Sequence, residues 1–207
     1  MRTLRKKAKQ RITRKKYLRK LHDKYPNCIH DSVDKGKFGE NNITYGEMNY
    51  NGIDLLYEYV KKNFPDVTTF IDVGSGRGKL CIHMSSFPQI KKSIGIEIVK
   101  ERHEDALDLL NTTASSYSKK IKFFNDDIFN IDLISNIYKN GTVFVWWSNL
   151  CFNQDITDRV YEKLQTELPS GSVIFCSKKN TQHQPFDSIK IPMSWSQNSE
   201  VYAYKKL

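Results

Sequence analysis

The sequence has few cysteines and lacks any long uninterrupted run of apolar residues. Its four cysteines lie far apart without a Cys-x-x-Cys pair, which argues against a disulfide framework and favours a reducing compartment. Two of them, Cys28 and Cys81, begin Cys-x-His pairs, but this spacing is too short for structural zinc, so we expect buried thiols and no metal. Since no segment is apolar enough to span a bilayer and no signal peptide begins the chain, we expect a soluble, intracellular protein without a membrane partner.

Acidic residues are nearly absent from residues 1–25, which contain twelve Lys or Arg and a single acid, Asp23. The net charge of this segment is therefore +11, whereas the whole chain carries +10, so residues 26–207 sum to −1. The sequence thus predicts two parts, a basic arm over residues 1–25 and one globular domain over residues 26–207. The arm carries a thin apolar stripe formed by Leu4, Ala8, Ile12, Leu18, Leu21 and Tyr25.

We expect the arm to become ordered only on a polyanion, because neutralising several phosphates releases counterions and drives binding to DNA or RNA. Such binding is independent of base sequence and weakens as the salt concentration rises. The cations assigned to this role are Arg5, Lys6, Lys7, Lys9, Arg11, Arg14, Lys15, Lys16, Arg19 and Lys20. A solvated or nuclear-targeting tail is the alternative interpretation.

Helices and strands are predicted to alternate after a loop at residues 31–52. Helical spacing of apolar residues predicts helices at 53–64, from about 79, at 99–110 and at 156–168. Short β-branched or apolar runs predict strands at 68–73, 93–97, 121–124, 142–146 and 172–177, and two final extended stretches, 186–195 and 201–204, predict a hairpin. The predicted fold class is therefore α/β: a Rossmann-like, doubly wound, mostly parallel sheet that ends in an antiparallel hairpin.

A glycine-rich loop follows the first predicted strand and opens the next helix, in the stretch TFIDVGSGRGK over residues 69–79. Ligands of open α/β sheets bind at this place, outside the carboxyl ends of the strands. Gly74, Gly76 and Gly78 form Gly-x-Gly-x-Gly preceded by Asp72, whereas a dinucleotide fingerprint requires Gly-x-Gly-x-x-Gly. The loop therefore argues against a pyrophosphate cradle.

Carboxylates end the next two predicted strands. Glu97 lies about twenty residues beyond the glycines, where an acid accepts hydrogen bonds from ribose hydroxyls, and Asp127 follows the third strand, placed to face an adenine. Asp72 is suited to the sulfonium and amino groups of S-adenosylmethionine. A nucleoside clamp without a phosphate cradle predicts S-adenosylmethionine as the cofactor and a class I methyltransferase as the fold.

From Tyr45 to Tyr204 the sequence resembles the DOT (disruptor of telomeric silencing) family of histone lysine methyltransferases, which lack a SET domain. The similar segments are YGE (45–47), FIDVGSGRG (70–78), SIGIE (93–97), NDDIF (125–129), SNLCF (148–152), SK (177–178) and SW (194–195) followed by Tyr202. The last match is the most specific, because generic methyltransferases do not share that hairpin. The resemblance implies that residues 26–207 form a DOT-like catalytic domain.

The resemblance also implies the residues of the site. Around the cofactor it places Tyr45, Glu47, Asp72, Gly74, Ser75, Gly76, Gly78, Lys79, Glu97, Asp127, Ile128, Ser148 and Asn149. It implies a lysine channel walled by Phe152, Trp195 and Tyr202, with Asn149 holding the geometry by hydrogen bonds. Of the neighbouring tryptophans Trp146 and Trp147, one is expected in the core and the other at the site.

The sequence departs from the family at several of these positions: Met48 replaces a hydroxyl residue, Lys79 a glutamine, Ile128 an aromatic residue and Ser148 an asparagine. The change at Lys79 matters most, because it brings a cation near the sulfonium. We therefore expect a lower affinity for the cofactor unless the Lys79 side chain turns outward.

No His or Glu stands out as a general base, and methyl transfer to lysine needs none. The reaction requires a neutral amine collinear with the S-methyl bond, and an apolar channel beside a sulfonium lowers the pKa of a lysine from about 10.4. The resemblance implies a nucleosomal core histone, histone H3, as substrate, reached with the help of arm-bound DNA. It further implies a monomer in the nucleus or, for a viral protein, in the host nucleus or a viral factory.

Two other functions are compatible with the sequence. A methyltransferase of RNA or DNA would use the same clamp and arm, although SNLCF lacks the [DNS]-Pro-Pro-aromatic motif of amino-directed base methylation. A chromatin-binding module with a degenerate pocket would keep the arm and lose the cofactor. Methylation of a non-histone lysine differs from the main hypothesis only in the partner.

Overall fold

The computed structural model describes residues 14–22, 46–136 and 141–206, so Tyr45 and arm residues 1–13 and 23–25 lie outside the described residues. The helices are α2 (Tyr50–Asn63), α3 (Lys79–Ser85), α4 (Lys100–Asn111), α5 (Ser115–Ser118), α6 (Leu133–Asn136) and α7 (Gln154–Glu167), with a 3-10 turn η2 (Ile128–Asn130). The strands are β1 (Val67–Val73), β2 (Lys92–Glu97), β3 (Ile121–Asn125), β4 (Thr142–Trp147), β5 (Val173–Cys176), β6 (Asp187–Ile191) and β7 (Ser199–Lys205). No helix in these ranges is long and apolar enough to cross a membrane.

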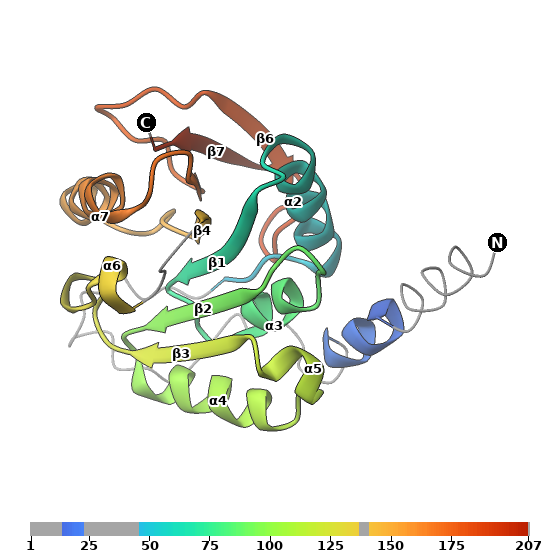
Figure 1. Ribbon diagram of the computed structural model, residues 1–207. Helices are drawn as coiled ribbons and strands as arrows, with labels where there is room; N and C mark the ends of the chain where they lie inside the picture. Colours follow the sequence, from blue (N-terminus) through green and yellow to red (C-terminus); the bar gives the residue numbers. More distant parts are fainter. Residues whose placement is uncertain (1–13, 23–45, 137–140, 207) are drawn as a thin grey trace.

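One seven-stranded sheet organises the domain, in the order β3-β2-β1-β4-β5-β7-β6 (Figure 1). The first five strands are parallel, whereas β7 runs antiparallel to both β5 and β6. This arrangement confirms the predicted α/β class and the final hairpin. Since the chain winds from β1 out to β3 and then returns to β4 beside β1, the carboxyl ends of β1 and β4 form the switch point where such sheets bind ligands.

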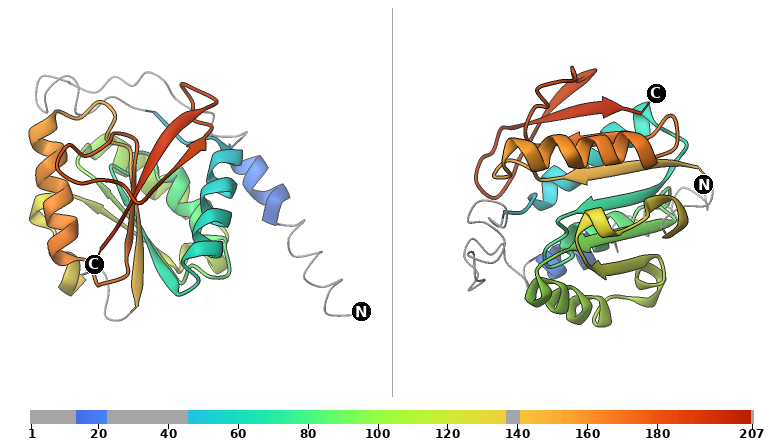
Figure 2. Two further views of the ribbon diagram at one scale, coloured as in Figure 1. Left: turned by 90° about the horizontal axis from the view of Figure 1, so that it is seen from above. Right: turned by 90° about the vertical axis from the view of Figure 1, so that its left-hand side faces the viewer.

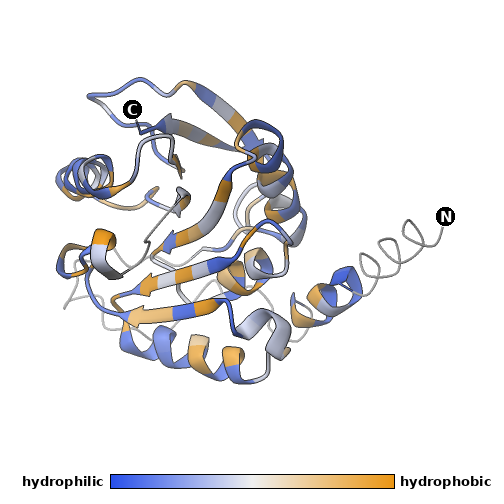
Figure 3. Cartoon of the chain, in the orientation of Figure 1, coloured by the Kyte–Doolittle hydropathy of each residue, from blue (hydrophilic) through white to orange (hydrophobic). Residues whose placement is uncertain are grey.

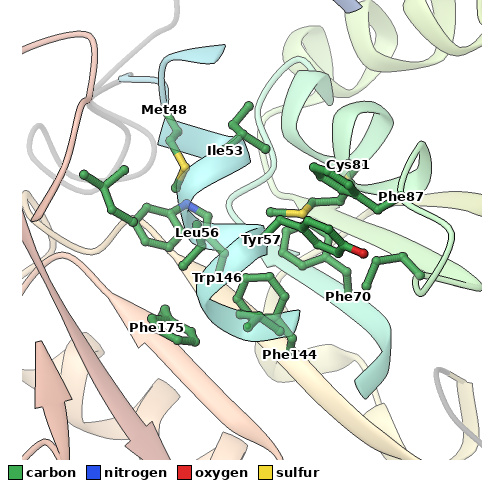
Figure 4. Packing of buried hydrophobic residues seen from close by; sticks show 14 of the residues in the cluster. Met48, Ile53, Leu56, Tyr57, Phe70, Cys81, Phe87, Phe144, Trp146 and Phe175 are labelled. Atoms are coloured by element: carbon green, nitrogen blue, oxygen red, sulfur yellow. The ribbon is translucent and has the colours of Figure 1, made fainter. Parts of the chain in front are cut away.

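Helices cover both faces of the sheet, as Figures 1 and 2 show. Helices α2, α3 and α4 pack on one face around Leu56, Phe70, Phe144 and Phe175 (Figure 4). Helices α6 and α7 pack on the other face, where Val145 and Trp147 alternate with Phe144 and Trp146 along β4. Both faces of the central strands are buried, and β4 is apolar after its first residue, Thr142. Strand β1 also includes Thr68, Thr69 and Asp72, so its hydropathy is mixed (Figure 3).

The sequence patterns predicted the long elements and missed the short ones. The ranges predicted from helical spacing and from short apolar or extended runs overlap helices α2, α3, α4 and α7 and all seven strands. The single turns α5, α6 and η2 contain too few residues to show a period.

Residues 14–22 form a helix that lies against the domain, and we refer to it as the docked helix. Leu18 is fully buried and Leu21 nearly so, in contact with Ile82 of α3 and Leu109 of α4. The Tyr17 ring lies 5.4 Å from that of Tyr117. The expectation that the whole arm is ordered only on a polyanion is therefore wrong for residues 14–22, because their apolar stripe already has a protein partner.

Docking also changes the role of one predicted phosphate-binding cation. Arg14 pairs with Asp54 of α2 at 3.4 Å, and its guanidinium lies 4.2 Å from the centre of the Phe87 ring. Its side chain is largely buried by these contacts. Lys16, Arg19 and Lys20 are exposed and thus available to a partner, so nucleic-acid binding by these residues stays a prediction.

Candidate active site

The glycine-rich loop crosses from the end of β1 toward β2. The amides of Gly74 and Ser75 both donate to the Ile96 carbonyl oxygen, at 2.8 and 2.9 Å. Gly78 has a φ of +75°, and a Cβ there would lie 2.5 Å from the Phe123 ring, so only glycine fits. Gly74 has a similar φ of +76°, yet a Cβ there would meet nothing within 4 Å. The loop therefore packs tightly on its β3 side and has open space above Gly74.

Glu97, the last residue of β2, anchors this loop. Its side chain is buried, and its two carboxylate oxygens accept hydrogen bonds from the backbone amides of Gly76, at 2.7 Å, and Val99, at 2.9 Å. Glu97 therefore holds the glycine-rich loop in place, and its binding of ribose hydroxyls stays a prediction.

Asp72 lies beneath the loop at the end of β1, and only 3% of its surface is exposed. Burial, and then the negative charge of Glu97, raise the pKa of Asp72 well above its usual value. The Cys81 thiol lies 3.9 Å from one Asp72 oxygen. A cation bound beside Asp72 would lower this pKa, and the predicted contact of Asp72 with the positive charge of a cofactor stays a prediction.

Lys79 does not turn outward, contrary to one of the two expected outcomes. The side chain is 5% exposed and forms an ion pair with Glu47, which is 10% exposed. Glu47 is in turn held by Ser194: the Glu47 amide donates to Ser194 Oγ at 3.1 Å, and the Ser194 amide donates to the Glu47 carbonyl at 2.8 Å. The ion pair therefore joins the start of α3 to the segment between β6 and β7, and it compensates the positive charge of Lys79.

Two predicted adenine-side residues lie together after β3. Asp127 precedes η2 and accepts a hydrogen bond from the Phe129 amide at 3.0 Å, which gives it a capping role. Ile128 is buried in the cluster on the α7 face. Contact of either residue with an adenine stays a prediction.

Asn149 connects the carboxyl ends of β4 and β5. It is completely buried, its Oδ1 accepts from the Lys178 amide at 2.8 Å, and its Nδ2 donates to the Lys178 carbonyl at 3.4 Å. The Lys178 ammonium donates to the Phe152 carbonyl at 3.1 Å. These bonds agree with the predicted geometric role of Asn149. Ser148, the preceding residue, is half-buried, and its contact with a cofactor stays a prediction.

The predicted channel aromatics fall into two places. Phe152 and Tyr202 pack against the α7-face cluster, where the Phe152 ring meets the edge of Trp147 at 5.7 Å. Trp195 is 41% exposed and lies over Gly46, where a Cβ would be 2.4 Å from its ring. Within the described part of the chain, Trp195 makes no ring contact with Phe152 or Tyr202. A lysine channel walled by Phe152, Tyr202 and Trp195 therefore stays a prediction. Phe152 and Tyr202 lie on the α7 face, whereas Trp195 lies at the Gly46 segment.

Among the described residues, the buried polar atoms without a hydrogen-bond partner include Ser75 Oγ, Trp147 Nε1 and Ser177 Oγ. They belong to the carboxyl ends of β1, β4 and β5, and Trp147 lies beside Cys176 in the register of β4 and β5. Buried polar atoms are normally paired, so these atoms are suited to hydrogen bonding with a bound molecule. Trp146 and Trp147 are both buried, one in the core cluster on each face of the sheet, so the placement of one of them at the site stays a prediction. The sequence pointed to Ser177 only as part of the similar SK segment at 177–178, since only the fold shows which hydroxyls stay unpaired.

The donors and acceptors at the carboxyl ends of the parallel strands fit a nucleoside that carries an amino acid. Glu97 supplies carboxylate oxygens, and Ser75 supplies a hydroxyl group. Lys79 and Glu47 supply one positive and one negative charge. The described residues contain no group of three or more His, Cys, Asp or Glu that could hold a metal ion.

Comparisons with known proteins agree with this geometry. A family model described as histone methylation protein DOT1 matches residues 28–202. A histone-lysine N-methyltransferase of Caenorhabditis elegans, specific for H3 lysine-79, is 28% identical over 142 residues, which are 66% of this chain and 15% of that protein. The chain thus spans a small part of the length of this relative.

Solved structures share the fold. An RNA methyltransferase from Salinibacter ruber, in complex with S-adenosyl-L-homocysteine, has a TM-score of 0.57 and 16% identity over 76% of this chain and 92% of that chain. The mitomycin 7-O-methyltransferase MmcR has a TM-score of 0.52 and 13% identity over 68% of this chain and 49% of that chain. These similarities establish a class I methyltransferase fold.

Proposed function

The chain belongs to the DOT1 histone methylation family, and from this premise we propose that it transfers a methyl group from S-adenosylmethionine to a core-histone lysine in the nucleosome. Histone H3 is the expected substrate, because the curated relative is named for a lysine of H3. The observation that carries the proposal is the family match over residues 28–202, which includes both the glycine-rich loop and the start of the β7 strand.

The residues of this chain would hold the cofactor by its separate parts. Glu97 accepts the ribose hydroxyls while it fixes the loop, and Ile128 packs against the adenine beside Asp127. Asp72 lies near the positive charge of the cofactor. When bound, S-adenosylmethionine supplies a methyl group activated by its sulfonium.

The protein must present a neutral amine to that methyl group. Phe152, Tyr202 and Trp147 offer apolar surface on the α7 face, which disfavours the ammonium form of an entering lysine. Burial, and then the hydrogen bond to Glu200, raise the pKa of Tyr202 above its usual value. Tyr202 therefore stays a neutral phenol at physiological pH and acts as wall and hydrogen-bonding group, not as a base.

Basic residues would bring the enzyme to its substrate. Lys16, Arg19 and Lys20 are exposed on the docked helix, so their charges are held at fixed positions on the domain. Nucleosomal DNA is the polyanion that we propose for them, with the protein acting as a monomer in the nucleus. Residues 1–13 would add to this electrostatic binding.

The proposal is tested by incubating the protein and radiolabelled S-adenosylmethionine with nucleosomes, free histones, naked DNA or bulk RNA in separate reactions. Gly76→Arg fills the loop, and Thr166→Arg adds the same side chain on the exposed face of α7 as a matched control. We expect label on a core histone only in nucleosomes, lost in Gly76→Arg and kept in Thr166→Arg.

Other outcomes would replace this function. Label in DNA or RNA would establish a nucleic-acid methyltransferase. If the wild-type protein showed no binding of S-adenosylmethionine, a chromatin-binding module would be the better description. Replacing Lys16, Arg19 and Lys20 together by Ala should weaken binding to nucleosomes, and the loss should become smaller as the salt concentration rises, because each lost phosphate contact removes the release of roughly one counterion.

A further inference from the structure

Three segments of the folded chain carry Lys and Arg but no acid. Residues 14–22, 86–96 and 109–121 together contain nine Lys or Arg and not one Asp or Glu. Residues 26–207 sum to −1 and include four of these lysines, so the rest of that range carries −5. The positive charges are therefore segregated, and the segregation extends from the arm into the folded domain.

Contacts between these segments join them into one surface. The Tyr17 hydroxyl of the docked helix accepts a hydrogen bond from the amide of Ala114, the residue before α5, at 3.4 Å. Lys120 Nζ, just after α5, donates to the carbonyls of Ser85 and Ile90 at 2.8 and 2.9 Å, which ties this turn to the loop before β2. Figure 1 shows the docked helix (blue), α5 and the starts of β2 and β3 on one side of the molecule, away from the arrowheads of these strands.

The basic surface, as we name it, consists of six exposed or half-buried cations: Lys16, Arg19, Lys20, Lys91, Lys119 and Lys120. Within the described residues Lys91 and Lys119 form no ion pair with an acid, and Lys91 Nζ instead donates to the Pro88 carbonyl at 2.9 Å. Burial, and then the charge of Lys91, lower the pKa of Lys120 below its usual value. Like charges held together in this way favour a polyanion, because it supplies the missing negative charge.

The aromatic and apolar residues around the basic surface favour one kind of polyanion. A membrane-bound helix presents apolar side chains to lipid, but Leu18 and Leu21 of the docked helix are buried against the domain, and the exposed large apolar residues of the described chain lie outside the three segments. Single strands stack their bases on exposed rings, but the Tyr17 and Tyr117 rings are half-buried beside each other. We propose that the basic surface binds the phosphate backbone of duplex DNA at the amino ends of β2 and β3.

The position of the basic surface decides what the bound DNA does. Lys91 precedes Glu97 by six residues along β2, which separates them by roughly 20 Å at about 3.3 Å per residue. DNA on the basic surface therefore docks the enzyme and leaves the cofactor site open to a different molecule, the protein substrate. The inference rests on the DNA contact of the proposed function and extends it from the docked helix to the domain, but it does not depend on methyl transfer.

The test measures binding of the full chain to a DNA duplex by fluorescence anisotropy over a range of salt concentrations. Lys91→Gln with Lys119→Gln removes two charges of the basic surface, and Lys190→Gln with Lys205→Gln, at exposed positions of β6 and β7, is the matched control. We expect the first double variant to bind about 10- to 60-fold more weakly at 100 mM salt and to reduce the slope of log affinity against log salt by about 2, since each phosphate contact contributes about 0.9. The control should keep the wild-type slope, as should Lys91→Arg with Lys119→Arg, which retains both charges.

A second measurement tests where the DNA lies. The affinity for S-adenosylhomocysteine, measured by calorimetry, should be the same with and without saturating duplex, because the two ligands occupy opposite ends of the strands. Competition between them would overturn the proposal, as would equal losses in the two Gln double variants, or binding of phosphatidylserine vesicles in place of DNA. Wild-type protein that binds DNA at this surface but does not bind S-adenosylhomocysteine would instead refute the proposed function and leave this inference intact.

Discussion

Lowering the pH from 7.5 to 5.5 should release the docked helix from the domain. His22 lies at the end of this helix, and its Nε2 is 3.3 Å from Nδ1 of His83 in α3. His83 is fully buried, and its Nε2 lies 3.2 Å from an Asp54 oxygen. If His83 Nε2 donates to the Asp54 carboxylate, its Nδ1 accepts a hydrogen bond from His22 Nε2, and the chain of hydrogen bonds is complete with both rings neutral.

The magnitude follows from the pKa of His22. Burial first, and then the charges of His83 and Lys79, lower the pKa of His22 from its usual 6.5 to about 3. Docking therefore favours neutral His22, is fully effective above pH 6.5, and weakens as the pH falls toward 3. Between pH 7.5 and 5.5 the docking equilibrium should fall by at most about tenfold, ~1.4 kcal/mol, since solvent at the rim screens part of the effect.

The other groups of this cluster do not cancel the effect. Burial lowers the pKa of His83 as well, so its contribution has the same sign. Burial alone would raise the pKa of Asp54, but its hydrogen bond to His83 and the charges of His83 and Arg14 bring the pKa below its usual value. Asp54 thus stays ionised across this pH interval.

Hydrogen exchange followed by mass spectrometry measures this release. Protection of the amides in residues 18–22, corrected for the intrinsic effect of pH, should fall about tenfold in the wild-type protein. His22→Phe keeps a ring beside Tyr50, 5.5 Å away in the wild type, and removes one of the two titrating histidines, so its protection should depend on pH less than that of the wild type, with the remainder due to His83. Equal protection at both pH values in the wild type would refute the reasoning, as would an NMR-measured His22 pKa near 6.5.

Three further substitutions probe other contacts. Leu18→Ala, at a fully buried position, should weaken docking of the helix by ~2–4 kcal/mol and expose residues 14–22 to trypsin at pH 8. Gly78→Ala should lower the free energy of unfolding by ~1–3 kcal/mol more than Gly74→Ala, because both have positive φ but only Gly78 faces the Phe123 ring; equal losses would argue against the clash. Asn149→Ala leaves the Lys178 amide unpaired and should cost about 1–3 kcal/mol in urea unfolding, and an unchanged midpoint would contradict this.

The sequence predicted the sheet because its evidence is local. Strand β1 contains six residues with little or no exposure, and such a run can be recognised without knowing its neighbours. The glycine spacing and Glu97 are also local signals, since the position of each follows from the end of a strand. The predicted loop and its carboxylate do meet in the structure, at Gly76.

The docked helix and the Lys79 ion pair could not be predicted for the opposite reason. The apolar positions Leu18 and Leu21 are visible in the sequence, but an amphipathic pattern does not identify its partner. Glu47 and Lys79 are separated by a helix and a strand, and only the folded chain brings them together. The sequence predicted that Arg14 binds phosphate and that Lys79 places a cation near the sulfonium. In the structure, Arg14 is paired with Asp54 and Lys79 with Glu47.

Three long-range ties organise the pocket without a ligand: Glu97 to Gly76, Asn149 to Lys178, and Glu47 to Ser194. Each connects the end of one strand or segment to a neighbour through a backbone amide. The first two fix β1 against β2 and β4 against β5, so the site needs little rearrangement when a cofactor binds. The third joins the segment before α2 to the segment between β6 and β7, neither of which belongs to the parallel part of the sheet. We therefore expect the carboxyl ends of β1 and β2 and of β4 and β5 to be more rigid than the segment that carries Glu47.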